Sequence, residues 1–169
     1  MMARWIRSST RPSGALAGAD TLEFEDACGR LAVAQTRHAS PILLWSERDA
    51  EYPFALIASL KLAPGRPMRW RSWGLAAAVA TYRQFGVAAY LDDGEMWLHG
   101  RRIAESKVEA IGECVVVASS FLMQFPAKCV ATPSPELEQA FRLRLEAQHG
   151  WQFEHSWPNE SEMLHYAVA

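Results

Sequence analysis

Acidic and imidazole side chains gather near the carboxyl end of the chain, in a pattern that could ligate a metal ion. Glu146 and His149 are spaced as on one face of a helix, and His155, Glu160, Glu162 and His165 follow. A di-metal site needs such pairs on facing helices, and a catalytic zinc site needs a defined third ligand, which the sequence does not single out. We therefore predict no metal site and interpret this segment as a solvated helix end followed by a polar tail.

Hydroxyl and aromatic groups form two other candidate contacts with a ligand. Ser119 and Ser120 follow an apolar run and could donate hydrogen bonds, although serines at a strand end also form turns. Trp70 and Trp73 lie among arginines and could stack on bases or face a partner, but packing between solvated arginines is the favoured interpretation. The chain holds seven tryptophans, which indicate either core packing or a lined cavity: Trp5, Trp45, Trp70, Trp73, Trp97, Trp151 and Trp157.

Three cysteines, Cys28, Cys114 and Cys129, are an odd number and contain no C-x-x-C spacing. This pattern supports neither a disulfide framework nor a cysteine zinc site, and it favours a reducing, cytoplasmic location. Nucleotide-binding glycine motifs and the G-x-S-x-G elbow of hydrolases are also missing from the sequence. The residues alone thus exclude several common enzyme classes.

The length and net charge of the chain limit the number of domains and the classes of partner. A chain of 169 residues suits one compact domain, and a formal net charge of −2 argues against nucleic acid or an anionic membrane as partner. No apolar run approaches the length of about 20 residues that a membrane helix needs. Residues 1–19 carry three arginines and no acid, so we predict a flexible tail there and a single α+β domain over 20–169.

Periodicity and turn signals predict helices joined to antiparallel hairpins, without the regular alternation of a parallel sheet. Gly86 is expected to end the best-defined helix, and His99-Gly100 to connect a tight hairpin. The expected elements are a helix from Asp20 or Thr21 through Leu31, a hairpin of strands 42–45 and 54–62, a helix over 67–85, strands 87–91, 95–98, 101–106 and 114–122, and a helix from Ser134 to Gly150.

The order of these elements, together with several short motifs, resembles the biotin/lipoate A/B protein ligase family. The resemblance covers about residues 35–122 and rests on the helix Gly74–Ala80, the hairpin Trp97–Ser106, the strand Cys114–Val117 and the preceding strand pair. It implies a mostly antiparallel sheet flanked by helices. It also implies a soluble protein that activates or transfers a biotinyl, lipoyl or octanoyl group toward a carrier domain.

Several positions depart from the family pattern. The family hairpin has the form Asn-Gly-Arg-Lys-Ile-Ala-Gly, and here Arg102 stands in place of the lysine and Glu105 in place of the last glycine. Arg102 keeps the charge and can hold a carboxylate through two N–H groups, but it cannot act as a general base. Gln35-Thr36 is followed by no glycine-rich loop, so the resemblance gives no support for ATP and magnesium, and the cofactor stays unassigned.

The resemblance therefore predicts a divergent member that binds or transfers a lipoyl- or octanoyl-type acyl group, as a transferase or ligase if it is active. The expected ligand-binding residues are Trp45, Trp97, Gly100, Arg102, Ser106, Lys107, Ser119 and Ser120. Cys129, next to Lys128, is the one candidate nucleophile, since a thiolate beside a cation suits octanoyl transfer. Expected partners are an acyl carrier or a lipoyl or biotinyl domain. The alternative is a non-catalytic protein-interaction module that has lost the adenylation residues.

Overall fold

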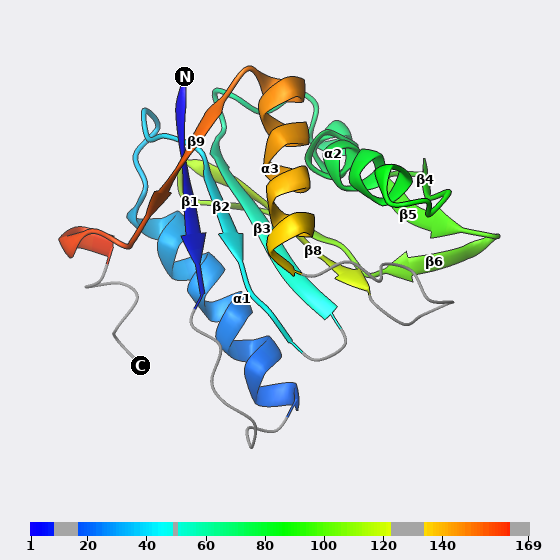
Figure 1. Cartoon of the computed structure of the whole chain (residues 1–169). Helices are drawn as coiled ribbons and strands as arrows, with labels where there is room; N and C mark the ends of the chain where they lie inside the picture. Colours follow the sequence, from blue (N-terminus) through cyan, green and yellow to red (C-terminus); the bar gives the residue numbers. More distant parts are fainter. Residues whose placement is uncertain (9–16, 49–50, 123–133, 163–169) are drawn as a thin grey trace.

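The computed structural model describes residues 1–8, 17–48, 51–122 and 134–162, and it consists of two sheets and three α-helices (Figure 1). The elements are β1 (Met2–Arg7), α1 (Ala17–Ala34), β2 (Ile42–Trp45), β3 (Glu51–Ser59), η1 (Pro67–Arg69), α2 (Trp70–Gln84), β4 (Tyr90–Asp92), β5 (Glu95–Leu98), β6 (Arg101–Ala104), β7 (Lys107–Ile111), β8 (Cys114–Leu122), α3 (Ser134–His149) and β9 (Gln152–Ser156). Among these, no helix is long and apolar enough to cross a membrane.

The large sheet has the strand order β7-β8-β3-β2-β1-β9, and the small sheet has the order β4-β5-β6. Pairing is antiparallel everywhere except on the two sides of β1, which runs parallel to both β2 and β9. The predicted α+β class with a mostly antiparallel sheet flanked by helices is confirmed.

Helices cover both faces of the large sheet. On one face, α1 packs Phe24, Cys28 and Leu31 against alternate residues of β2, β3 and β8. On the other face, α2 and α3 enclose a larger core that includes Trp45 and Phe121. Because strands β2 and β3 are covered on both sides, nearly all of their residues are buried, as the continuous apolar runs predicted.

The first residues of the chain are not the predicted tail. Residues 2–7 form β1, which lies inside the sheet between β2 and β9, and α1 already begins at Ala17. The charge of Arg4 is met by Glu162 through two contacts of 2.7 Å, and that of Arg7 by Glu138 at 3.2 Å. Both partners lie more than 130 residues away in the sequence. The first residues therefore look like a solvated tail when only the neighbouring sequence is considered.

Two backbone details position the small sheet. His99 and Gly100 both have positive φ, at 51° and 77°, as the predicted two-residue hairpin turn requires. The return strand is shorter than predicted, because β6 ends at Ala104 and the chain then crosses to the large sheet. There it forms β7, an edge strand that the sequence analysis did not predict, antiparallel to β8.

One stretch of β8 has no strand partner on the β7 side, because the β7 pairing ends at Ala118. The Tyr82 hydroxyl of α2 covers this open edge. It accepts a hydrogen bond from the Leu122 backbone N–H at 2.9 Å and donates to the Ser120 carbonyl at 3.4 Å. On this side, the end of β8 is thus held by a side chain instead of a strand, while its other edge pairs with β3.

Candidate functional site

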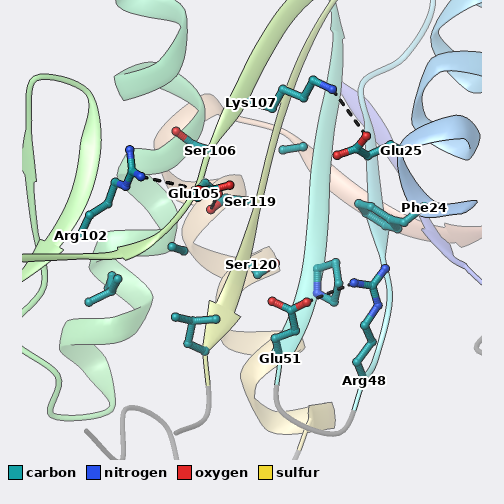
Figure 2. A pocket seen from close by; sticks show the side chains of 15 residues that line it. Phe24, Glu25, Arg48, Glu51, Arg102, Glu105, Ser106, Lys107, Ser119 and Ser120 are labelled. Carbon is teal, nitrogen blue, oxygen red and sulfur yellow. Dashed lines mark hydrogen bonds and ion pairs between the residues drawn. The ribbon is translucent and has the colours of Figure 1, made fainter. Parts of the chain in front are cut away.

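A cavity of about 750 Å³ lies on the α1 face of the large sheet, where the chain crosses from β6 to β7 (Figure 2). Its floor is the end of β3 and β8, and one wall is the amino-terminal half of α1. The lining residues are Phe24, Glu25, Arg48, Glu51, Pro53, Arg102, Ile103, Ala104, Glu105, Ser106, Lys107, Ala118, Ser119, Ser120 and Leu122. Its volume falls within the range of about 300–1,000 Å³ that is usual for small-molecule sites.

Five of the predicted ligand-binding residues come together in this cavity: Arg102, Ser106, Lys107, Ser119 and Ser120. The first three lie on β6, on the crossing segment and at the start of β7. The two serines lie on β8, where Ser120 pairs with Pro53 of β3 across the floor. Residues more than ten positions apart are therefore gathered by a single feature, the transfer of the chain from one sheet to the other.

Each cation that lines the cavity is paired with a carboxylate that also lines it. Arg48 contacts Glu51 at 3.1 Å. Arg102 Nη2 lies 3.6 Å from Glu105 Oε1, and Lys107 Nζ lies 3.5 Å from Glu25 Oε2. The described lining thus carries three positive and three negative side chains, with no net charge.

The three serines differ in what their hydroxyls do. Ser106 donates to Glu95 Oε2 at 2.8 Å, and Ser119 donates to the Glu105 carbonyl at 2.9 Å. No hydrogen bond of the Ser120 hydroxyl is found among the described residues, and Ser120 lines the cavity. Ser120 is therefore the serine whose proton is available to a ligand.

The structure does not bring the remaining predicted residues into the cavity. Trp45 is 1% exposed and lies on the opposite face of the sheet, where its ring contacts Tyr52, Phe121 and Phe141. Trp97 is half-buried on the small sheet and donates from Nε1 to the Asp92 carbonyl. Gly100 serves the exposed hairpin turn, and Cys129 lies outside the described residues.

Several lining residues were not singled out from the sequence. Phe24 and Glu25 belong to α1, whereas Arg48 precedes β3 and Glu51 begins it, within the connection of the predicted hairpin. The apolar periodicity of α1 indicated which residues face the sheet, but it gave no sign that the sheet end beside Phe24 is left open. The sheet end is open because β7 is short and its pairing with β8 ends at Ala118.

The two described cysteines are free and buried, and neither suits nucleophilic chemistry. Burial raises the pKa of the Cys28 thiol to about 12 and that of Cys114 to about 11, so both stay protonated at neutral pH. Both residues act as small apolar groups under α1, consistent with the sequence interpretation.

The predicted solvated end of α3 is wrong in one respect. The His149 ring stacks on Trp151, with centroids 4.2 Å apart, and meets Trp73 edge-on at 5.1 Å. Burial lowers the pKa of His149, which favours the neutral ring. Trp70 packs against the core, and its Nε1 donates a hydrogen bond to the Pro64 carbonyl at 2.7 Å. In the part of the chain that the structure describes, no group of three or more candidate ligands is placed to hold a metal ion.

The mixed six-stranded sheet, the separate three-stranded sheet and the cavity between the strand crossing and α1 define a protein with the biotin/lipoate ligase fold, which confirms the predicted resemblance at the level of the fold. Among solved structures, the chain is similar to a bi-partite lipoate protein ligase from Thermoplasma acidophilum, with a TM-score of 0.77 and 10% identity over 99% of this chain and 91% of that one. It is also similar to lipoate-protein ligase A bound with ATP, with a TM-score of 0.72 and 12% identity over 99% and 93%.

The similarity extends more weakly to biotin ligases. The apo biotin protein ligase of Aquifex aeolicus gives a TM-score of 0.54 and 11% identity, over 88% of this chain and 69% of that one. No family model matches the chain, and no curated protein matches its sequence. The property shared with these proteins is therefore the fold.

Proposed function

We propose that this protein binds a lipoyl- or octanoyl-type acyl group in the cavity beside Arg102. The observation that carries the proposal is the convergence of Arg102, Ser106, Lys107, Ser119 and Ser120 on one cavity, which the resemblance to acyl-group ligases had pointed to from the sequence. The similar fold of lipoate protein ligases supports the same ligand class.

The cavity offers both parts of the recognition that such a ligand needs. Ile103, Ala104, Ala118 and Leu122 present apolar surface suited to a hydrocarbon chain. The Arg102 guanidinium is half-exposed and can donate two N–H groups to a carboxylate or a carbonyl oxygen. Arg102 binds and orients the acyl end but transfers no proton, because an arginine side chain does not serve as a general base.

The described residues do not fit a magnesium nucleotide. All three cations of the lining are already paired, so the cavity offers no net positive field to a triphosphate. The sequence from Gln35 to Tyr52 contains no glycine, and a phosphate-binding loop of backbone amides depends on glycines there. The proposed function therefore involves no ATP-dependent step.

An acyl transferase would need a carrier protein, and an acyl carrier or a lipoyl domain is the proposed partner. The similar Thermoplasma ligase belongs to an archaeal lipoylation system together with its E2 lipoyl domain. Cys129 remains the proposed nucleophile for octanoyl transfer. Its thiolate would attack the thioester carbonyl, and the thiol of the carrier would leave. Intact mass after mixing with octanoyl carrier protein, compared with Cys129→Ala, tests that step.

The second candidate is a non-catalytic module that keeps the fold for protein interaction. The charge-neutral lining favours it, because an adenylating site would present unpaired cations. This candidate predicts that an apo lipoyl domain binds the chain with the same affinity before and after Arg102→Ala, while no acyl ligand binds.

Calorimetric titration of the full chain with octanoate, lipoate and biotin, each with and without ATP, tests the proposal. We expect heat from an acyl ligand without ATP, and at least a fivefold loss of affinity in Arg102→Ala. The matched control is Arg101→Ala, an exposed neighbour on β6 outside the cavity lining. No heat from any ligand would overturn the proposal, as would equal losses in the two arginine variants.

A further inference from the structure

Glu105 lies at the edge of the cavity and competes with any acidic ligand for Arg102. Its Oε1 is 3.6 Å from Arg102 Nη2, and its side chain is 91% exposed. The backbone carbonyl of Glu105 accepts a hydrogen bond from Ser119 at 2.9 Å, which ties the main chain of the crossing segment to β8. This hydrogen bond fixes the backbone position from which the exposed Glu105 carboxylate reaches Arg102.

The remaining lining charges do not relieve this competition. Lys107 faces Glu25 of α1, and Arg48 faces Glu51 of β3 (Figure 2). A ligand carboxylate that enters the cavity must displace Glu105 from Arg102 or share the guanidinium with it, and two carboxylates at that distance repel one another. This repulsion weakens the binding of a charged ligand and does not affect an uncharged one.

An uncharged acyl end meets no such cost. A carbonyl oxygen can accept a hydrogen bond from Arg102 while Glu105 keeps its ion pair, because a guanidinium has five N–H donors. The Ser120 hydroxyl, for which no hydrogen bond is found among the described residues, can supply a second neutral donor on the cavity floor. The lining thus complements an amide or ester better than a free acid.

We propose that Glu105 is a specificity-determining residue: it acts as an internal counter-ion to Arg102, so that the cavity selects acyl ligands with an uncharged end over free carboxylic acids. This inference rests on the proposed acyl binding. An exposed ion pair of this kind carries up to about a fivefold effect on an equilibrium, so we expect a preference of about threefold to fivefold, which falls as ionic strength rises.

The test compares hexanoate with hexanamide, which have the same chain and differ in charge, by calorimetric titration of the wild-type chain and two variants. Glu105→Gln keeps the shape and removes the charge. Glu113→Gln is the matched control, because Glu113 is an exposed glutamate in the β7–β8 turn, outside the cavity lining. Thermal unfolding of each variant verifies that it is folded.

We expect the wild-type chain to bind hexanamide more tightly than hexanoate. Glu105→Gln should gain threefold to fivefold for hexanoate and leave hexanamide unchanged, and Glu113→Gln should change neither. Equal binding of the two ligands by the wild-type chain overturns the inference and leaves the proposed acyl binding standing. An equal gain for both ligands in Glu105→Gln also overturns it. Binding of neither ligand by any variant overturns the proposed function itself.

Discussion

Gly74 of α2 is the position where a single added methyl group should disturb the sheet beneath the helix. A Cβ at Gly74 would lie 2.7 Å from Cβ, Cγ1 and Cγ2 of Val117 on β8. Val117 cannot rotate out of the way, because its Cβ is attached directly to the strand backbone and both of its methyl groups branch from that atom. Either α2 or β8 must therefore move to accommodate Gly74→Ala.

The magnitude follows from two opposing contributions. Alanine in place of a mid-helix glycine stabilises a helix by about 1 kcal/mol, and overpacking a close contact costs about 1–3 kcal/mol. With the strand backbone involved, we expect the upper part of that range, which gives a net loss of about 2 kcal/mol in the free energy of unfolding. Gly29 of α1 provides the matched control, because its added Cβ would meet nothing within 4 Å, and Gly29→Ala should stabilise by about 1 kcal/mol.

Chemical denaturation of the two variants measures the difference directly. We expect the variants to lie about 3 kcal/mol apart, on opposite sides of the wild-type chain. Val117→Ala should cost about 1 kcal/mol less in the Gly74→Ala background than alone, because it removes two of the three crowded atoms. A Gly74→Ala variant as stable as Gly29→Ala would refute the packing argument.

Three further predictions concern polar groups of the described structure. Tyr82→Phe leaves the open edge of β8 without its hydrogen-bond partner, so the free energy of unfolding should fall by about 1–2 kcal/mol. Amide hydrogen exchange at the end of β8 should become faster, and an unchanged exchange rate would contradict this prediction. Burial raises the pKa of Glu138 to about 7. The stability that the protonated carboxyl contributes at acid pH therefore falls by about 2–4 kcal/mol as the pH rises from about 4.5 to 7.5. Glu138→Gln should flatten the profile of unfolding free energy against pH over that window. Glu162→Ala removes the buried carboxylate that pairs with Arg4, which then keeps hydrogen bonds to neutral groups only, and it should cost about 3 kcal/mol by denaturation. Asp26→Ala breaks a more exposed helix pair and should cost below about 0.5 kcal/mol. Equal losses would show that the burial of the pair does not matter.

The local signals in the sequence predicted most of the helices and hairpins. The turn at His99-Gly100, the end of α2 at Gly86 and the start of α3 at Ser134 each depend on residues that lie next to one another, and each prediction was confirmed. The sequence could also predict that the hairpin lies close to β8, because the resemblance assigned ligand-binding residues to both.

The position of Trp45 shows what such signals miss. Every residue of β2 is buried, so the alternation that usually separates the two faces of a strand is absent from its sequence. The resemblance predicted the tryptophan beside the ligand, whereas Trp45 lies on the α3 face of the sheet and the cavity lies on the α1 face. A continuous apolar run indicates a strand but does not indicate which side each residue faces.

The outer strands were missed for a different reason. β1 and β9 are short and polar in part, and their pairing joins residues about 150 positions apart, for example Arg4 with Glu154. Nothing local marks either strand, because the partners that neutralise Arg4 and Arg7 come from the end of the chain. Only the three-dimensional arrangement shows that residues 2–7 complete the sheet.

The parallel pairing of β1 with β9 also bears on how the protein folds. During synthesis, β1 emerges before the other described strands, but the strand that covers its outer edge emerges only after α3. Until then, β1 has an open row of backbone donors and acceptors, which can pair with another chain. The contact also has a long loop to close, which makes such pairings slow. Completion of the sheet is therefore a late event, and the nascent chain is most exposed to misassembly just before β9 joins it.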